Sequence, residues 1–365
     1  MTALDTHIKE LIRAGGPISV AEYMRIVLTG RADSYYMRGE AFGAAGDFVT
    51  APEISQVFGE LIGVWCVDVW RQLGKPERFS LVELGPGRGT LMKDALRAAR
   101  VAPEFLRAAS IVLVEVSPVL RQQQKEAMAE APVASVGWLE RFEDLRADAG
   151  PIIAIANEFF DALPIRQLVR ADERWMERCV GLNKDGELAF GAAPGAINPL
   201  VVAERLRGAA DGSIVELAPA RSAVARLIGE RIRSAGGAAL VIDYGFEGPA
   251  AGDTLQAIKR HAFADVLVEP GTADVTSHVD FAALREAFTG GGAVVTPLAE
   301  QGGFLLRLGV DARVAALKRS ASVSQAEALD RAHQRLTGAK AMGSLFKVLC
   351  AYAPATLCPA GLSNE

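Results

Sequence analysis

The sequence predicts an α/β fold with a doubly wound sheet, preceded by helices and interrupted by an inserted β-hairpin. Residues 80–100 read as a short buried strand, a glycine turn and a helix, which is the unit that opens such sheets. Further apolar strands follow at 110–116, 133–136 and 151–156, and a helix and a fifth strand come after residue 220. Near the end of the chain, AVVTPLAEQGGFLLRLGV reads as two strands joined by a turn at Gly302 and Gly303, an antiparallel pair that would close the sheet.

Length and composition narrow the class of protein. The chain has 365 residues, half of them hydrophobic, and a net charge of −5. It is long enough for one large domain with insertions or for two domains, and its acidic balance argues against nucleic acid as a partner. The four cysteines lack metal-ligand spacing, the start shows no signal peptide, and the longest apolar run, LIGVWCVDVW, is too short to cross a bilayer. We therefore expect a soluble cytoplasmic protein without a metal site and without membrane insertion.

The region before the glycine strand, residues 1–79, is predicted to be mainly helical. Thr50 and Glu53, with a proline between them, form a capping-box pattern at the start of a long helix. Capping alone would explain both residues. The glycine-rich segment just before them, which contains Asp47, reads as a long loop, and such loops are often functional. Asp47 and Thr50 are therefore candidates for a lid or a substrate contact.

The turn after the first strand indicates which ligand it suits. Gly85, Gly87 and Gly89 would let backbone N–H groups approach a small molecule without a Cβ in the way. Thr90 replaces the last small residue of the dinucleotide pattern, and no Lys-Ser/Thr pair follows, so a P-loop is excluded. Glu83, two residues before the first glycine, would repel a pyrophosphate but suits an ammonium or sulfonium group. The alternative is a glycine turn that binds no ligand.

The second predicted strand, 110–116, carries Glu115 near its end. A carboxylate at this place can accept hydrogen bonds from both ribose hydroxyls of an adenosine. Alternatively, it only offsets the dipole of the following helix, for which Ser117 is the expected N-cap. A third strand at 133–136 leads to Trp138, on which an adenine could stack, although the indole could equally belong to the core.

The fourth predicted strand, 151–156, runs into Asn157, Glu158 and Asp161 of the segment NEFFDALP. An amide and two carboxylates would then crowd the carboxyl end of a strand, where doubly wound sheets bind their ligands. The alternative is an ordinary turn, because Asn and Asp are common turn residues and a proline ends the segment.

The second half of the chain supplies weaker candidates. Residues 166–220 read as an insertion with a β-hairpin around an Asn-Lys-Asp-Gly turn. A helix and a fifth strand follow, and Tyr244 lies at the end of that strand. Residues 246–275 read as a loop. His278 could be a surface residue and Asp280 a helix cap, but with Tyr244 they are candidates for a substrate or lid contact.

Seven stretches, in order along nearly the whole chain, resemble the MidA family of S-adenosylmethionine-dependent methyltransferases, which includes a mitochondrial complex I assembly factor that is a protein arginine methyltransferase. The resemblance implies a class I methyltransferase fold, Rossmann-like with an antiparallel last strand, plus N-terminal helices and an inserted hairpin and helical cap. It also implies S-adenosylmethionine as cofactor. The stretches are PISVAEYM, GDFVTAPEISQVFGELIG, LVELGPGRGTLMKDALR, NEFFDALPIRQ, VIDYG, DVTSHVDFAAL and MGSLFKVL. The expected division is an N-terminal region 1–79, a core of 80–165 with 221–350, an insertion 166–220 and a tail 351–365.

The resemblance also implies an acceptor, an arginine in a subunit of an NADH–quinone oxidoreductase. A guanidinium is always protonated, and carboxylates in bidentate contact with it can localise its charge. Glu158 and Asp161, with Asn157 orienting them, are therefore the expected catalytic residues. Two alternatives stay open, a cofactor-binding assembly factor without catalysis and a nucleotide-dependent oxidoreductase, which Glu83 disfavours. The expected cofactor-binding residues are Glu83, Gly85, Gly87, Gly89, Glu115, Trp138 and Asn157.

Overall fold

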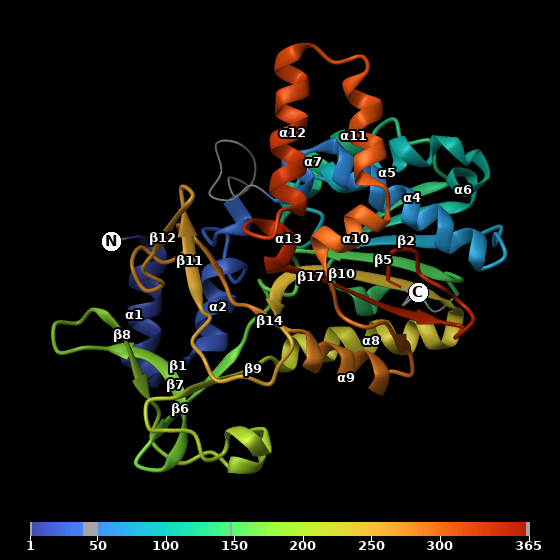
Figure 1. Cartoon of the computed structure of the whole chain (residues 1–365). Coiled ribbons are helices and arrows are strands. Elements are labelled where there is room, and N and C mark those ends of the chain that lie inside the picture. The colour runs from blue at the N-terminus through green and yellow to red at the C-terminus, as the bar shows by residue number, and fades with distance from the viewer. Residues whose placement is uncertain (1, 39–49, 147, 363–365) are drawn as a thin grey trace. The chain divides into compact units, whose positions relative to one another are not determined.

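The computed structural model of the protein describes residues 2–38, 50–146 and 148–362, which divide into two compact units (Figure 1). The larger unit consists of Val49–Phe160, Val224–Glu247 and Phe281–Glu365, and the smaller unit of Met1–Phe48, Asp161–Ala223 and Gly248–Asp280. The division predicted from the sequence stays a prediction, because compactness alone does not show which segments fold independently. In the part of the chain that is described, no helix has the length and apolar character needed to span a membrane.

The larger unit is built on a sheet with the order β15-β17-β10-β5-β2-β3-β4. The five strands from β10 to β4 are parallel, whereas β17 runs antiparallel to β10. This confirms the predicted class I methyltransferase-like fold with an antiparallel last strand. The chain builds outward from β2 to β4 and then returns to β5 on the other side of β2, so the topological switch point lies between β2 and β5. The strands are β2 Phe79–Leu84, β3 Ala109–Val114, β4 Ser135–Leu139, β5 Ile152–Asn157, β10 Gly237–Phe246, β15 Val294–Val295, β16 Ala299–Glu300 and β17 Phe346–Ala353.

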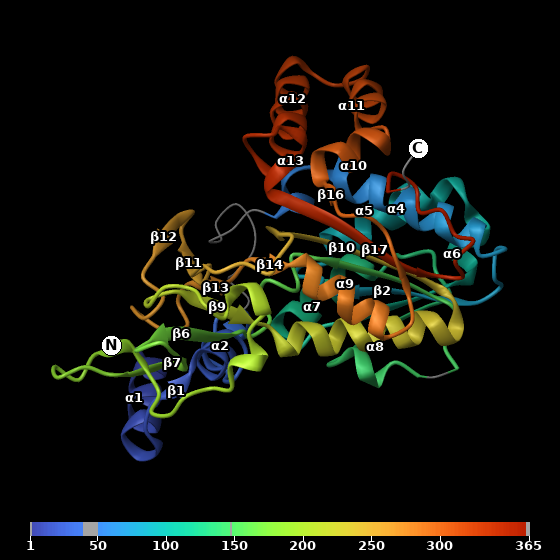
Figure 2. The same ribbon diagram turned by 60° about the horizontal axis from the view of Figure 1, so that its bottom comes forward.

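Helices cover both faces of this sheet: α4 and α5 lie on one face and α8 and α9 on the other (Figures 1 and 2). Alternate strand residues such as Leu81, Ile153 and Leu240 are fully buried in one core with Trp65 of α4 and Leu91 of α5. The hydrophobic effect on this face therefore holds the sheet to the helices that precede and follow β2. The helices are α3 Ala51–Ile54, α4 Gln56–Gln72, α5 Thr90–Ala98, α6 Pro103–Ala108, α7 Pro118–Met128, α8 Pro219–Ala235, α9 Phe281–Gly290, α10 Gln301–Arg307, α11 Val310–Lys318, α12 Val323–Thr337 and α13 Met342–Leu345.

The turn predicted at Gly302 and Gly303 and the strand predicted after it are both wrong, because this segment forms α10 and runs into α11. A Cβ added to Gly302 would stand 2.4 Å from the carbonyl oxygen of Thr337, so the glycine is required by the close approach of α10 to the end of α12. The strand that closes the sheet is β17, at the far end of the helical segment that follows.

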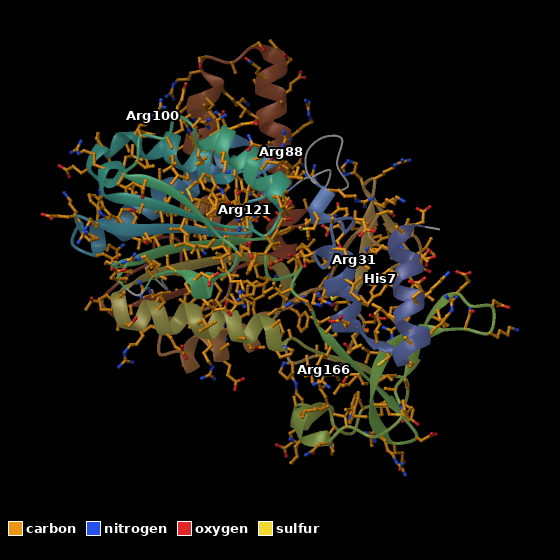
Figure 3. The ribbon with its side chains drawn as sticks, turned by 180° about the vertical axis from the view of Figure 1, so that it is seen from behind. His7, Arg31, Arg88, Arg100, Arg121 and Arg166 are labelled. Carbon is orange, nitrogen blue, oxygen red and sulfur yellow. The ribbon has the colours of Figure 1, made fainter. Side chains whose placement is uncertain are left out.

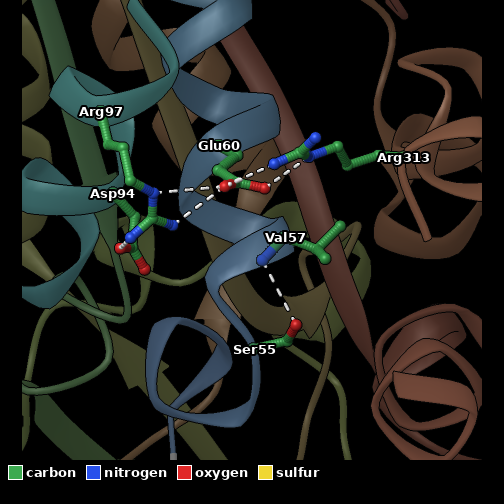
Figure 4. A network of polar contacts seen from close by, with 6 residues as sticks. All are labelled: Ser55, Val57, Glu60, Asp94, Arg97 and Arg313. Atoms are coloured by element: carbon green, nitrogen blue, oxygen red, sulfur yellow. Dashed lines mark hydrogen bonds and ion pairs between the residues drawn. The ribbon is translucent and has the colours of Figure 1, made fainter. Parts of the chain in front are cut away.

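An ionic network around the buried Glu60 ties three helices of the larger unit together (Figure 4). Glu60 of α4 is 4% exposed and accepts hydrogen bonds from Arg97 of α5 at 2.9 Å and from Arg313 of α11 at 2.7 Å. Arg97 also contacts Asp94 at 2.8 Å. Burial opposes the ionisation of Glu60, but the hydrogen bonds from Arg313 and Arg97 outweigh it and lower the pKa of the carboxyl.

Glu60→Gln is expected to lower the free energy of unfolding by about 1–3 kcal/mol at pH 7, because two guanidinium groups lose a buried counter-charge. A carboxyl with a lowered pKa stabilises the fold above its unfolded pKa. That contribution disappears as the pH falls through the folded pKa. The difference between the two proteins in urea unfolding should therefore shrink below about pH 4.5. Glu104→Gln, at an exposed carboxylate of α6, is the control; an equal effect there would contradict the prediction.

The smaller unit combines two helices with two antiparallel sheets. Its main sheet has the order β1-β7-β6-β9 with β8 paired to β7, and its second sheet the order β12-β11-β13. Leu182 lies opposite Leu188 across the Asn-Lys-Asp-Gly turn, which confirms the predicted hairpin. Residues 246–275 are not the predicted loop, since the chain reverses at Arg260 and His261, both with positive φ, and pairs β11 with β12. The elements are α1 Ala3–Gly15, α2 Val20–Leu28, β1 Ile18–Ser19, β6 Arg166–Ala171, β7 Arg174–Leu182, β8 Leu188–Ala192, β9 Ile214–Leu217, β11 Gln256–Lys259, β12 Ala262–Ala264, β13 Asp274–Thr276 and β14 Val279–Asp280.

Candidate functional site

The predicted cofactor residues of the larger unit share one face of its sheet. Glu83 of β2 pairs with Ile155 of β5 on one side and with Leu113 of β3 on the other. Because side chains alternate along a strand, residues two positions further on lie on the same face at the carboxyl end. The side chains that this register places there are Glu83, Glu115, Asn157 and, opposite Leu113, Trp138. Glu83 and Asn157 flank the switch point, where open α/β sheets bind ligands, and Glu115 and Trp138 lie on the side of β3 and β4.

Glu83 is a buried carboxyl with an unused acceptor. Its side chain is 3% exposed in relative terms, and its Oε2 atom has no hydrogen-bond partner among the described residues. Burial raises the pKa of Glu83 to about 8, although the backbone N–H of Met92 opposes this shift. An unpaired buried acceptor is costly, and a bound cation would relieve that cost. The site therefore fits a ligand that carries an ammonium group.

The main contribution of the glycine turn is its backbone conformation, because two of its three glycine N–H groups already donate within the protein. Gly85, Gly87 and Gly89 have φ values of +63°, +52° and +80°, a region that residues with a Cβ rarely adopt. A Cβ on Gly85 would lie 3.0 Å from the ring of Phe159, so this glycine also permits close contact with the segment after β5. The N–H of Gly85 donates to Val114 and that of Gly89 to Pro86, so both are used within the protein.

Glu115 is held by the start of α7. Its Oε1 accepts from the N–H of Ser117 at 2.8 Å and its Oε2 from Gln124 at 3.2 Å. Burial raises its pKa, while the Ser117 N–H and the Gln124 amide oppose the shift. Arg121, labelled in Figure 3, donates from Nε to the carbonyl oxygen of Glu115 at 2.7 Å. Glu115 thus contacts the helix start, yet a carboxylate with two bonds keeps lone pairs for a ligand.

Glu158 stands just beyond β5 in a strained conformation. Its φ is +51°, which is uncommon for a residue with a Cβ and costs about 1–3 kcal/mol. Its carboxylate accepts from the Asn157 amide at 3.2 Å and from the N–H of Ala51 at 3.2 Å. Asn157 is 9% exposed, and its Oδ1 has no partner within the described residues. The carboxyl end of β5 therefore presents a fixed carboxylate beside a buried amide oxygen.

The capping box predicted at Thr50 is wrong. The Thr50 side chain makes no capping bond, α3 ends after four residues, and Ser55 caps a separate helix, α4. Glu158 instead accepts the first N–H of α3, which its position in the sequence does not reveal. Glu53 is also used differently, since its Oε1 accepts from the Thr90 hydroxyl at 2.6 Å, beside the glycine turn. The sequence did not predict this contact, because the capping-box pattern already offered a role for Glu53.

The remaining candidates among the described residues, Tyr244, His278 and Asp280, do not all lie in the same unit. Tyr244 is buried in the larger unit, with its ring edge-on to Phe346 at 5.5 Å between centroids. Asp280, in the smaller unit, accepts from the N–H of Gly248 at 3.2 Å. Asp47 lies outside the described residues. His278 is half-buried, and burial lowers its pKa.

Arg221, which no sequence pattern singles out, organises part of the smaller unit. It is 2% exposed, and it donates to the carbonyl oxygens of Asp161 at 3.0 Å and His278 at 2.7 Å. It also donates to the backbone of Leu163 and to the hydroxyl of Ser277. One guanidinium therefore holds the segment that begins at Asp161 against the segment that contains His278.

Arg221→Lys is expected to lower the free energy of unfolding by about 3 kcal/mol, because a lysine has three donors on a single nitrogen and cannot reproduce this fork. Urea unfolding, with a probe for the smaller unit such as the fluorescence of Trp175, would measure the change. Arg226→Lys, at an exposed position of the same helix, should have little effect. A loss of less than 0.5 kcal/mol in the Arg221 variant would contradict the role assigned to this guanidinium.

Comparison with known proteins decides the family. A family model described as "Putative S-adenosyl-L-methionine-dependent methyltransferase" matches residues 61–297, more than half of the chain. The chain belongs to this family. It is an S-adenosylmethionine-dependent methyltransferase, so the cofactor predicted from the sequence is confirmed and the oxidoreductase alternative is not supported.

Individual relatives agree with this assignment. The methyltransferase is 38% identical over 376 residues to "Protein arginine methyltransferase NDUFAF7 homolog, mitochondrial" of Drosophila melanogaster, which covers 96% of this chain and 85% of the relative. The human protein arginine methyltransferase NDUFAF7 is 36% identical, over 95% of this chain and 82% of its own. A solved structure of a "likely methyl transferase" from Burkholderia thailandensis, bound to S-adenosyl-homocysteine, is 30% identical with a TM-score of 0.81 and covers 99% of this chain and 93% of that chain.

Proposed function

We propose that this methyltransferase methylates an arginine of a protein. The observation that supports the acceptor class is the set of relatives, several of which are named protein arginine methyltransferases and match at 36–38% identity over more than nine-tenths of the chain. The acidic composition is compatible with a protein acceptor and unfavourable to nucleic acid.

The residues around the switch point are the proposed cofactor site. S-adenosylmethionine supplies a methyl group on a sulfonium. In our proposal the unpaired Oε2 of Glu83 holds the ammonium group, and the glycine turn provides room for the methionine portion. Glu115 accepts hydrogen bonds from the ribose, Trp138 lies beside the adenosine, and the Asn157 amide helps to orient the amino-acid end. Methyl transfer is an in-line displacement, so these residues act mainly by positioning.

Glu158 is the proposed acceptor-binding carboxylate. Its strained backbone and its two donors fix the carboxylate at the end of β5, close in sequence to Asp161, the second candidate. A carboxylate that binds two guanidinium nitrogens localises the positive charge there, which leaves the third nitrogen a better nucleophile. The leaving proton passes to a carboxylate or to water after transfer.

The partner that we propose is a subunit of a respiratory NADH–quinone oxidoreductase, as the resemblance to the MidA family implies, and the compartment that we propose from the composition is the cytoplasm. Mass spectrometry of arginines in the subunits of that complex, compared between a deletion strain and a strain carrying the protein, tests the acceptor. A methylarginine that is present only with the protein supports the proposal. Intact binding of S-adenosylhomocysteine with no methylarginine in any subunit would instead favour an assembly factor without catalysis.

A further inference from the structure

We propose that Gln124 is a positioning residue for the nucleoside half of S-adenosylmethionine, a role that no sequence pattern indicated. Gln124 lies on α7 and is fully buried, at 0% relative exposure. Its side chain joins the glycine turn, Glu115 and Trp138 into one hydrogen-bonded unit. The inference rests on the proposed ribose role of Glu115 and is independent of the acceptor.

Three hydrogen bonds define this unit. Nε2 of Gln124 donates to the carbonyl oxygen of Gly87 at 2.7 Å and to Oε2 of Glu115 at 3.2 Å. Oε1 of Gln124 accepts from the indole Nε1 of Trp138 at 2.9 Å. An indole N–H can only donate and a carbonyl oxygen can only accept, so the orientation of the amide is fixed by its partners. No other neutral side chain of this length offers two donors and one acceptor in this arrangement.

The bond to Gly87 controls the conformation of the turn. Gly87 has a φ of +52° and no side chain, so its own steric preferences determine the orientation of its peptide group only weakly. In a trans peptide the C=O of Gly87 and the N–H of Arg88 point in opposite directions. Because Gln124 draws the carbonyl toward α7, the N–H of Arg88 is directed away from α7. Gln124 thus sets the direction of a donor within the ligand-binding turn.

The bond to Glu115 controls the carboxylate. With Ser117 on one oxygen and Gln124 on the other, the plane of the carboxylate is fixed. One lone pair on each oxygen then remains for a pair of neighbouring hydroxyls, which is the arrangement that a ribose diol requires. Trp138 contributes through its N–H to Gln124, and this contact makes it a second positioning residue.

The test measures binding of S-adenosylhomocysteine and of 5′-methylthioadenosine, which lacks the amino-acid end, by calorimetry without any acceptor protein. Gln124→Met should weaken 5′-methylthioadenosine by about tenfold or more, because the shared nucleoside half loses its fixed partners, and S-adenosylhomocysteine by at least as much, because the glycine turn also loses its contact with Gln124. Gln122→Met, at an exposed position of the same helix, should change neither by more than about twofold. Unchanged affinities in Gln124→Met, or a loss confined to S-adenosylhomocysteine, would overturn the proposal.

A second substitution, at Trp138, distinguishes a positioning role of Gln124 from a general effect on the stability of the fold. Trp138→Phe keeps the ring but removes the N–H, and it should weaken both ligands severalfold. In the double variant, Trp138→Phe should add almost nothing to the loss caused by Gln124→Met, because the bond between them is already gone. Independent, additive losses would overturn the proposal. If Gln124→Met does not fold, Trp138→Phe alone tests the proposal. Unchanged affinity of Trp138→Phe for both nucleoside ligands would then overturn the proposal. Absence of arginine methylation would refute the proposed function without affecting these binding results.

Discussion

Glu158→Gln should abolish methyl transfer, by about 10²–10⁴-fold in rate, while it leaves the affinity for S-adenosylhomocysteine within about twofold. The glutamine carbonyl can still accept from the N–H of Ala51 and from the Asn157 amide, so the start of α3 keeps its partner. What the variant loses is the negative charge that we assign to the guanidinium of the acceptor. Methylation of a respiratory subunit measured by mass spectrometry, beside calorimetry with S-adenosylhomocysteine, separates the two effects.

The matched control is Glu53→Gln, which changes a neighbouring carboxylate that bonds the Thr90 hydroxyl. This variant should retain at least a tenth of the transfer rate, because its amide oxygen can still accept from Thr90. Loss of cofactor affinity in Glu158→Gln would move Glu158 into the cofactor site. Undiminished transfer would remove it from the mechanism.

Glu83→Gln should weaken S-adenosylhomocysteine binding by about 100-fold, because a buried carboxylate paired with an ammonium is replaced by a neutral amide. The pH dependence provides a second signature. In the free protein the pKa of Glu83 is raised to about 8 by burial, so below that pH the carboxyl must release a proton before it can hold the ammonium. Affinity should therefore rise by up to tenfold per pH unit from about pH 6 to pH 8 in the natural protein, and this rise should be absent in Glu83→Gln.

The stability of the ligand-free protein should change with pH in the opposite direction to the ligand affinity. The folded pKa of Glu83, about 8, lies above its usual value of 4.5. The folded state therefore binds the proton more tightly than the unfolded state between these values. Stability falls as the pH rises through that window. Glu83→Gln should make this fall smaller in urea unfolding, because only the raised pKa of other buried carboxyls such as Glu115 then contributes to it, whereas Glu130→Gln, at an exposed carboxylate, should leave it unchanged. Identical pH profiles for Glu83→Gln and the natural protein would contradict the buried, cation-binding role.

The sequence was sufficient for features that depend on local periodicity. The strand, glycine turn and helix at 80–100, the N-cap at Ser117 and the hairpin after β7 all lie where the sequence predicts them. Each depends on residues within a few positions of one another, whose preferences for turns, caps or buried strands are strong. The location of Glu83 at the end of the first strand followed from the same local reading.

Gly302 and Glu53 were misread because their partners are distant in the sequence. Gly302 looks like a turn residue, but it is small because the carbonyl of Thr337 stands where a Cβ would be. Glu53 looks like a helix cap, but it bonds the hydroxyl of Thr90. Gln124 lies in a polar RQQQK run that is typical of an exposed helix face, and yet it is fully buried.

The sequence by itself determined the succession of the first four core strands, β2 to β5, and the presence of a carboxylate before the glycine turn, because these are written in neighbouring residues. Only the tertiary structure decided that β5 returns beside β2, and that Glu83, Glu115 and Asn157 therefore share one face of the sheet. Only the tertiary structure showed that the side chains of Gln124 and Arg221 hold the segments around them. Those results depend on strand register and on hydrogen bonds between residues far apart in the chain, and such contacts form only when the whole sheet and its helices pack together.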